Sequence, residues 1–405
     1  MRRPTSGGRI VAGLGALGLV VAAVTFATTP VAGQNSAGQD GGAPALVITA
    51  HNGGAPIPYT TPRTPWGDPD LQGTWTSDDT GNIPLSRPQA LADRLYQNDQ
   101  EWAARQKQIA GGIVAAQNAV GSFRGDFARR AFRQTSLVVD PPDGRVPATT
   151  AAAKLRAAPR DRGTFGDGPF ESVQDFTLYD RCVTRGIVGS TLRVIYGNGN
   201  RIVQAPGMVA ISYERIHDTR VFYTDGRPHI NQGIRQLLGD SRARWEGDVL
   251  VVDTTNLTDK TSIGLNGNGL RHSDKMTITE RFKRVADDIV QYQVTLNDPV
   301  TYEKPFTISM PWTPLDGGDL LPYDCHEGNY AVRQSLGAER AEDAALAADL
   351  AKGITRARRP VQDGLGIGGQ PVGEGGPAGR GGGAGGRGGG RGDGARGEAG
   401  PPTQN

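Results

Sequence analysis

From residue 187 onward, apolar and polar side chains alternate in short runs, which is the pattern of β-strands with one buried face. Turn formers such as Asp225-Gly226 and Glu246-Gly247-Asp248 separate the runs and indicate tight connections. The positions expected on the buried faces are Val209, Ile211 and Tyr213; Met276, Ile278, Glu280 and Phe282; Val290, Tyr292, Val294 and Leu296; and Phe306, Ile308, Met310 and Trp312. The pattern therefore predicts a meander of antiparallel strands.

So many one-sided strands must bury their apolar faces in a closed barrel or a β-sandwich, and closure also removes exposed edges. The early Gly73-Thr74-Trp75 resembles the Gly-x-Trp of the first strand in calycin barrels, the lipocalin-like group. This resemblance implies a calycin-like barrel. We predict a mainly β protein of this class, with a β-sandwich as the alternative.

The part of the chain before the meander predicts smaller elements. Residues 71–76 form an expected first strand and residues 136–140 an expected short one. A helix is predicted over 89–108 as an N-terminal helical decoration, with Ser86 as its cap. A last helix is expected near 339–351.

Composition divides the chain into four parts. A basic start and an apolar run predict a signal peptide over 1–33, with an uncleaved membrane anchor as the alternative. A linker is expected over 34–63 and a single β-rich domain over 64–350. Residues 362–405 are mostly Gly with scattered Arg, which predicts a disordered tail because such a sequence buries too little apolar surface to fold.

Charge and export narrow the class of partner. The net charge is only +2, from 44 basic and 42 acidic residues, which argues against a dedicated nucleic-acid-binding protein. No segment after the signal peptide is apolar enough to span a membrane. We expect a periplasmic or secreted protein that binds a small molecule.

The two cysteines of the chain lie in matching polar segments. Residues 179–182 read Tyr-Asp-Arg-Cys, and residues 323–327 read Tyr-Asp-Cys-His-Glu. In an oxidising compartment Cys182 and Cys325 are expected to form a disulfide. Metal binding by both cysteines and His326 is the alternative, although the tight spacing typical of zinc sites is missing.

A disulfide would bring the two segments together. Tyr179, Asp180 and Arg181 are then expected to contact a ligand, and His326 with Glu327 could form an acid–base pair. The alternative is a polar network that only holds the chain together.

Several strings resemble a large family of exported bacterial proteins of uncharacterised function. They are Pro-Trp-Gly-Asp-Pro-Asp-Leu at 65–71, Val-Asp-Pro-Pro-Asp-Gly-Arg at 139–145, Tyr-Asp-Arg-Cys at 179–182, Gly-Asp-Ser-Arg-Ala-Arg-Trp-Glu-Gly-Asp at 239–248 and Cys-His-Glu-Gly-Asn-Tyr at 325–330. The resemblance spans about residues 60–345. It implies export and one shared core, and it assigns no activity.

Glu280 lies on the face predicted to point inward. A carboxylate in an apolar interior has a raised pKa unless a cation pairs with it, and raised carboxyl groups serve as general acids or bases near neutrality. We therefore consider Glu280 catalytic together with His326 and Glu327. The alternative is a buried ion pair with an arginine.

Three further histidines are candidate ligand-binding residues. His217 continues the alternation of the preceding strand, His229 follows a turn, and His272 follows the Gly/Asn-rich loop 264–270, which we expect to cover a pocket. Imidazoles suit zinc, iron or copper, but the helical spacing of zinc proteases is missing, so no metal is assigned. No dinucleotide fingerprint occurs, and no cofactor is expected.

Three functions follow in order. The first is a lipocalin-like protein that binds a small apolar or aromatic ligand in the barrel. The second is a cofactor-independent hydrolase, lyase or isomerase that uses Glu280, His326 and Glu327. The third is a metalloenzyme with histidine ligands.

Overall fold

A computed structural model describes residues 43–358, apart from 56, 92, 119–129, 158–168, 195, 264–270 and 316. The predicted signal peptide at 1–33, the predicted tail at 362–405 and the glycine-rich loop at 264–270 lie outside the described residues. The described helices are α1 (Asp99–Asn118), α2 (Ala151–Ala157), α3 (Gly186–Thr191) and α4 (Ala331–Ala351). The described strands are β1 (Gly73–Thr76), β2 (Val138–Asp140), β3 (Gly199–Ala205), β4 (Met208–Tyr213), β5 (Thr219–Tyr223), β6 (Asp240–Glu246), β7 (Val249–Thr255), β8 (Thr277–Ala286), β9 (Ile289–Asn297) and β10 (Phe306–Pro314).

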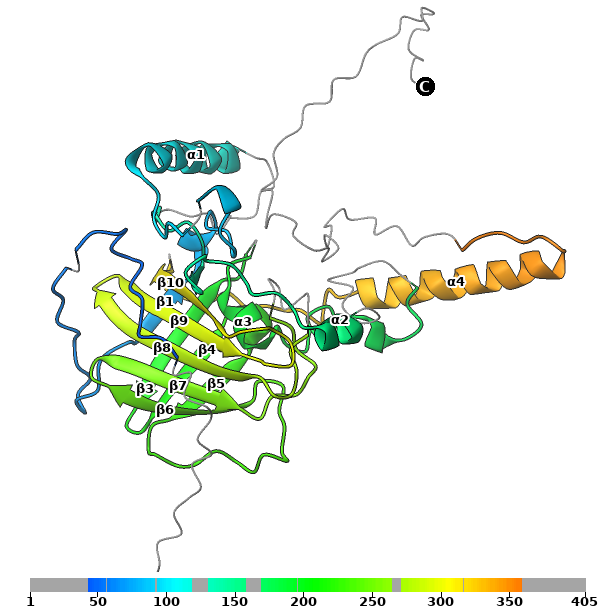
Figure 1. Cartoon of the computed structure of the whole chain (residues 1–405). Coiled ribbons are helices and arrows are strands. Elements are labelled where there is room, and N and C mark those ends of the chain that lie inside the picture. Colours follow the sequence, from blue (N-terminus) through cyan, green and yellow to red (C-terminus); the bar gives the residue numbers. More distant parts are fainter. Residues whose placement is uncertain are drawn as a thin grey trace, which may run out of the picture. The chain divides into compact units, whose positions relative to one another are not determined.

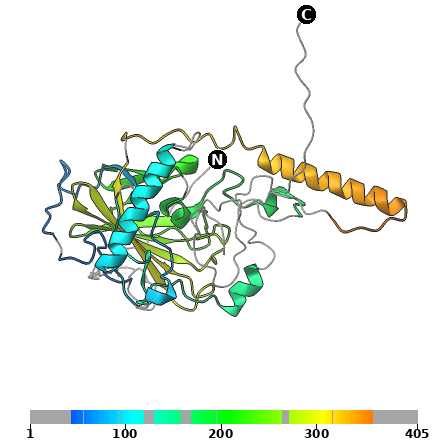
Figure 2. The same cartoon turned by 90° about the horizontal axis from the view of Figure 1, so that it is seen from above.

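The described strands form one sheet that closes on itself (Figures 1 and 2). Neighbours follow the order β1-β3-β4-β5-β6-β7-β8-β9-β10, and β1 also pairs with β10, which completes a barrel of nine strands. The remaining edge of β10 is shared, because Trp75 of β1 lies opposite Pro314 and Val138 of β2 lies opposite Ile308. The predicted mainly β, calycin-like barrel class is confirmed.

One pairing differs from the predicted meander. β5 and β6 run parallel, with Tyr223 opposite Arg242, so the barrel is mixed. Gly226 has a φ of 76°, which fits a turn at Asp225-Gly226. The chain does not return there as a hairpin, because residues 224–239 carry it across before β6 begins. Parallel neighbours require such a long connection.

The predicted inward faces form the core. The side chains of Glu280, Phe282, Val290, Tyr292, Val294, Met310 and Trp312 are each 0% exposed. Three aromatic rings fill the centre: the centroid of Tyr292 lies 4.9 Å from that of Phe282 and 4.7 Å from that of Trp312. Burial of these rings is the main stabilising contribution of the fold.

α3 packs against this core. Every residue of the helix is buried, and Ile187, Val188 and Leu192 belong to the same hydrophobic cluster as the inward residues of the strands. The barrel is therefore packed by its own side chains and by one short helix.

The first helix begins later than predicted. A single 3-10 turn occupies Gln89–Leu91, and α1 begins at Asp99. Asn98 is the residue that caps it, because its Oδ1 accepts from Glu101 N while a Glu101 oxygen accepts from Asn98 N, a reciprocal capping box. The expected cap, Ser86, instead accepts a hydrogen bond from Val146 N. The last helix, α4, begins at Ala331 and is longer than predicted.

Residues 43–55, which lie in the predicted linker, are bonded to the outer face of β9. Gln291 accepts from the backbone N–H groups of Thr49 and Ala50, and Gln293 accepts from that of Val47. Both glutamines are completely buried as a result. Within the described ranges, no helix combines the length and the apolar character needed to cross a bilayer.

Candidate functional site

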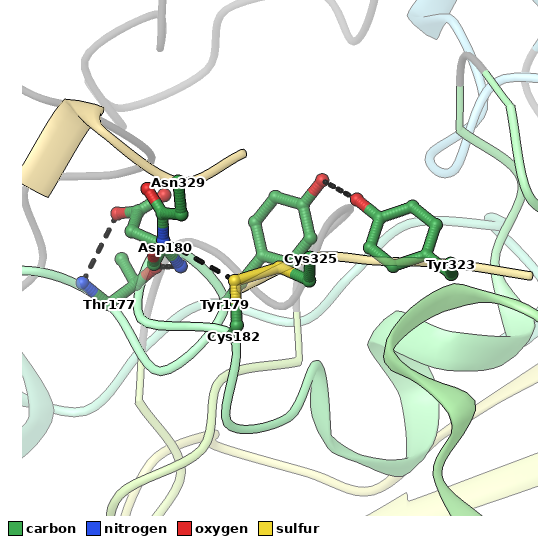
Figure 3. The surroundings of a disulfide bond; sticks show 7 residues. All are labelled: Thr177, Tyr179, Asp180, Cys182, Tyr323, Cys325 and Asn329. Atoms are coloured by element: carbon green, nitrogen blue, oxygen red, sulfur yellow. Dashed lines mark hydrogen bonds between the residues drawn. A yellow bond between two sulfur atoms is a disulfide. The ribbon is translucent and has the colours of Figure 1, made fainter. Parts of the chain in front are cut away.

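Cys182 and Cys325 form the predicted disulfide (Figure 3). Their Cα atoms lie 5.7 Å apart, although the cysteines are separated by 143 positions in the sequence. Such a Cα distance is typical of disulfides. The bridge joins the segment before α3 to the segment after β10.

The two polar segments meet around this bridge, as predicted. The phenol oxygens of Tyr179 and Tyr323 lie 3.5 Å apart and point toward each other in Figure 3. Asn329 Nδ2 donates to the carbonyl oxygen of Asp180 at 2.6 Å and to the sulfur of Cys182 at 3.3 Å. The disulfide therefore fixes the relative position of two tyrosine rings.

A third tyrosine, Tyr196, completes an aromatic cluster at this place. We call Tyr179, Tyr196 and Tyr323 the tyrosine cage. The centroids of Tyr196 and Tyr323 lie 6.5 Å apart, and all three side chains are half-buried. Burial raises the pKa of Tyr323 well above its usual range, so its phenol is protonated at neutral pH.

Arg215 lies in contact with all three rings of the cage. Its guanidinium carbon is 4.2 Å from the centroid of Tyr196, 5.5 Å from that of Tyr179 and 5.6 Å from that of Tyr323. Cation–π contacts of this kind are electrostatically favourable within about 6 Å. The cage is thus an aromatic and cationic site.

A strained turn positions Arg215. The 3-10 turn Arg215–His217 connects β4 to β5, and φ is 63° at Ile216 and 46° at His217. This left-handed region is costly for a β-branched residue such as Ile216. Of the five described non-glycine residues with positive φ, three are Cys182, Ile216 and His217, which lie in the segments that build the cage. Strain of this kind concentrates at functional sites.

The turn is held from both sides by buried carboxylates. Glu214 accepts from Gly199 N at 2.9 Å, and a Cβ at position 199 would lie 2.7 Å from that carboxylate, so only glycine fits. Asp218 accepts from the hydroxyl of Thr184 at 2.6 Å, which ties the turn to the segment before α3. Burial raises the pKa of Asp218.

Arg185 follows in the same segment and is the most unusual side chain of the site. It is 1% exposed, its guanidinium carbon lies 5.7 Å from the centroid of Tyr179, and no described residue accepts a hydrogen bond from any of its three guanidinium nitrogens. Burial, followed by the neighbouring charge of Arg215, lowers the pKa of Arg185 to about 9. It remains charged at neutral pH.

Other residues predicted for this site have different surroundings. Asp180 is buried and accepts from the backbone N–H of Thr177, while Arg181 donates to Gln174. His326 and Glu327 are exposed. The expected pairing of the acid–base residues with Asp180 and Arg181 is therefore absent from the hydrogen bonds of the described residues.

Glu280 lies in the barrel interior and is paired with Arg220. The contact is bidentate, with nitrogen–oxygen distances of 3.0 and 2.6 Å, and Tyr292 donates to the same carboxylate at 3.0 Å. Arg220 also donates to Tyr213, whose pKa burial raises to about 12. Its remaining partners are the hydroxyls of Ser241 and Thr254.

The alternative interpretation of Glu280, a buried ion pair, is thus the one that the structure shows. Glu280 is completely buried, whereas His326 and Glu327 are exposed, so the three residues predicted as catalytic do not share one environment. This geometry gives no support to the acid–base enzyme.

The three predicted histidines occur in three separate surroundings. His217 is exposed in the strained turn, because β4 ends at Tyr213 and the strand alternation stops there. His229 Nδ1 contacts Asp240 at 2.8 Å. His272 is buried, with its ring bonded to the Thr261 hydroxyl and to the Ser273 carbonyl oxygen. Among the described residues, no group of three or more His, Cys, Asp or Glu side chains is arranged to hold a metal ion.

Comparisons with known proteins add no family to this geometry: no family model, curated protein or solved structure matches the chain.

Sequence reasoning found Tyr179 and missed Arg185, Tyr196 and Arg215. Arg185 lies three positions after Cys182, so its closeness to the expected disulfide was a usable signal. Tyr196 and Arg215 carry no such signal, because their approach depends on the course of the chain around the barrel.

Proposed function

We propose that this protein is an exported, lipocalin-like binding protein that takes a small aromatic ligand at the tyrosine cage. The observation that carries the proposal is the meeting of three half-buried tyrosine rings from three separate segments of the chain. Rings held in this way offer flat apolar surfaces and phenol groups to a ligand at little cost in side-chain entropy.

The cage is a better candidate than the centre of the barrel. The inward residues are tightly packed rings, and the single carboxylate among them is already bound by Arg220. The cage, in contrast, is partly open to solvent and surrounded by strained backbone. We therefore place the ligand at the disulfide end and not in the interior.

Export is supported by two independent features. The chain begins with a basic and apolar segment typical of a signal peptide. The structure contains a disulfide, and disulfides persist in oxidising compartments such as the periplasm. Both features agree with a periplasmic or secreted protein.

The test is binding of 2-naphthol and 2-naphthoate to the oxidised protein, followed by ligand-observed NMR and calorimetry. Tyr196→Ala should weaken binding of the probe, because it removes the ring nearest to Arg215. Tyr223→Ala is the matched control, since Tyr223 also contacts an arginine, Arg227, at 3.9 Å outside the cage. Failure of both probes to bind, or equal loss in the two variants, would refute the proposal.

A further inference from the structure

We infer that the ligand of the tyrosine cage is an aromatic carboxylate whose carboxylate group pairs with Arg185. This inference rests on the proposed function and specifies its ligand class. It starts from a buried cation that the described part of the chain leaves without a hydrogen-bond partner.

A buried guanidinium normally has a carboxylate or several carbonyl oxygens as partners, because removing its charge from water is costly. Arg220 follows this rule through Glu280. Arg185 is equally buried, yet the described residues offer none of its nitrogens a hydrogen-bond acceptor. An acceptor supplied from outside the chain would remove this cost.

The charges around Arg185 specify the sign of that acceptor. The strongest electrostatic influence of another ionised side chain on Arg185 comes from a second cation, Arg215. Two neighbouring guanidinium groups repel each other, and an anion between or beside them relieves the repulsion. The phenol groups of the cage add hydrogen-bond donors, which also favour an anion.

The shape of the surroundings specifies the rest of the ligand. A guanidinium binds a carboxylate through two parallel hydrogen bonds in one plane. Arg185 contacts the Tyr179 ring, and Tyr179 is itself half-buried at the cage. A ligand whose carboxylate reaches Arg185 therefore has its remaining atoms beside aromatic rings, which suits a planar ring system attached directly to the carboxylate.

The experiment compares three probes of one shape and different charge: 2-naphthoate, 2-naphthamide and 2-naphthylmethylammonium. Calorimetry on the oxidised protein should give 2-naphthoate an affinity roughly tenfold or more above that of 2-naphthamide, the usual worth of a charged hydrogen bond. The ammonium probe should bind most weakly.

Arg185→Met should remove the preference for the carboxylate, leaving 2-naphthoate and 2-naphthamide with equal Kd. Arg227→Met is the matched control, because Arg227 also lies over a tyrosine but is paired with Asp225. If Arg185→Met does not fold, Arg185→Lys provides the same test, with a loss of several-fold for 2-naphthoate and none for 2-naphthamide.

The outcomes separate this inference from the proposed function. Equal binding of the carboxylate and the amide by the unmodified protein would overturn the inference and leave the aromatic site intact. A preference that survives in Arg185→Met, or an unchanged 2-naphthoate Kd in Arg185→Lys, would overturn the role of Arg185. Displacement of 2-naphthoate by an equal concentration of inorganic phosphate would indicate a phosphate site and overturn the ligand class.

Discussion

Two buried arginines of this protein have opposite surroundings. Arg220, inside the barrel, is bonded to Glu280, Tyr213, Ser241 and Thr254. Arg185, beside the tyrosine cage, is equally buried but bonded to none of the described residues. Both lie near tyrosines and away from water, so residue type and burial do not distinguish them.

The difference lies in who supplies the anion. The barrel interior contains its own carboxylate, so its polar network is complete and fits a structural role. The cage has two arginines and three phenols around a position where the chain contributes rings and cations. A complete network stabilises the fold, whereas an incomplete one costs stability and is retained where a ligand completes it.

The largest effect should come from removing the disulfide, which belongs to only one of the two regions. Replacing Cys182 and Cys325 with Ser should lower the free energy of unfolding by about 5 kcal/mol in the chain-entropy model, because the bridge closes a very long loop. Denaturant unfolding measures the loss. NMR should show the tyrosine cage disturbed while the Arg220–Glu280 pair stays intact, and equal disturbance of both would contradict the separation.

Breaking the complete network should cost nearly as much. Glu280→Gln leaves the charge of Arg220 buried without a carboxylate, and the expected loss is about 3–5 kcal/mol. The double variant Glu280→Leu with Arg220→Met should recover most of that loss, because no charge then remains buried. A double variant as unstable as the single one would show that packing, and not charge, determines the effect.

The same type of substitution should have the opposite sign at the cage. Arg185→Met removes a buried charge that lacks a partner, so unliganded protein should become more stable by about 1–3 kcal/mol. Thermal unfolding without ligand measures the change. A destabilised Arg185→Met would mean that Arg185 already has a satisfactory environment.

A smaller effect should follow pH through His272. Burial lowers the pKa of His272, so the folded protein keeps this ring neutral while the unfolded chain protonates it below about pH 6.5. The contribution to stability is complete above that pH and decreases as pH falls through the lowered folded pKa. His272→Gln should reduce the slope of stability against pH in this window, and an unchanged slope would exclude His272 as its source.

The smallest effect concerns the strain of the turn beside the cage. His217 is exposed with φ of 46°, so His217→Gly relieves left-handed strain at a position with little packing to lose. The expected gain in unfolding free energy is below about 1 kcal/mol. A loss of stability would show that the His217 side chain contributes contacts that outweigh its strain.

The sequence was sufficient for the barrel and for one half of the site. Alternation identified the buried faces of β8, β9 and β10, because a strand has a strict period of two that needs no knowledge of its neighbours. The pairing of the two cysteines was predictable from compartment and number. From that pairing alone, the approach of Tyr179 to Tyr323 followed.

The rest depends on three-dimensional packing. The inward Glu280 was identified, but its partner Arg220 lies on another strand, and nothing in the spacing of the two residues indicates the pair. His217 looked like the continuation of a strand, and only the left-handed turn at Ile216 redirects it to solvent. Gln291 and Gln293 looked solvent-exposed, because the residues that cover them come from more than two hundred positions earlier.

The disulfide also determines how this molecule would respond to mechanical force. β3 to β10 all lie between Cys182 and Cys325, so a chain pulled at its two ends carries the tension through the sulfur–sulfur bond and past these strands. Only the segments outside the bridge, including β1, β2 and α4, would extend under load. The 143 positions within the bridge would add nothing to the stretched length until the disulfide is reduced, which at about 3.5 Å per residue amounts to roughly 500 Å of hidden chain.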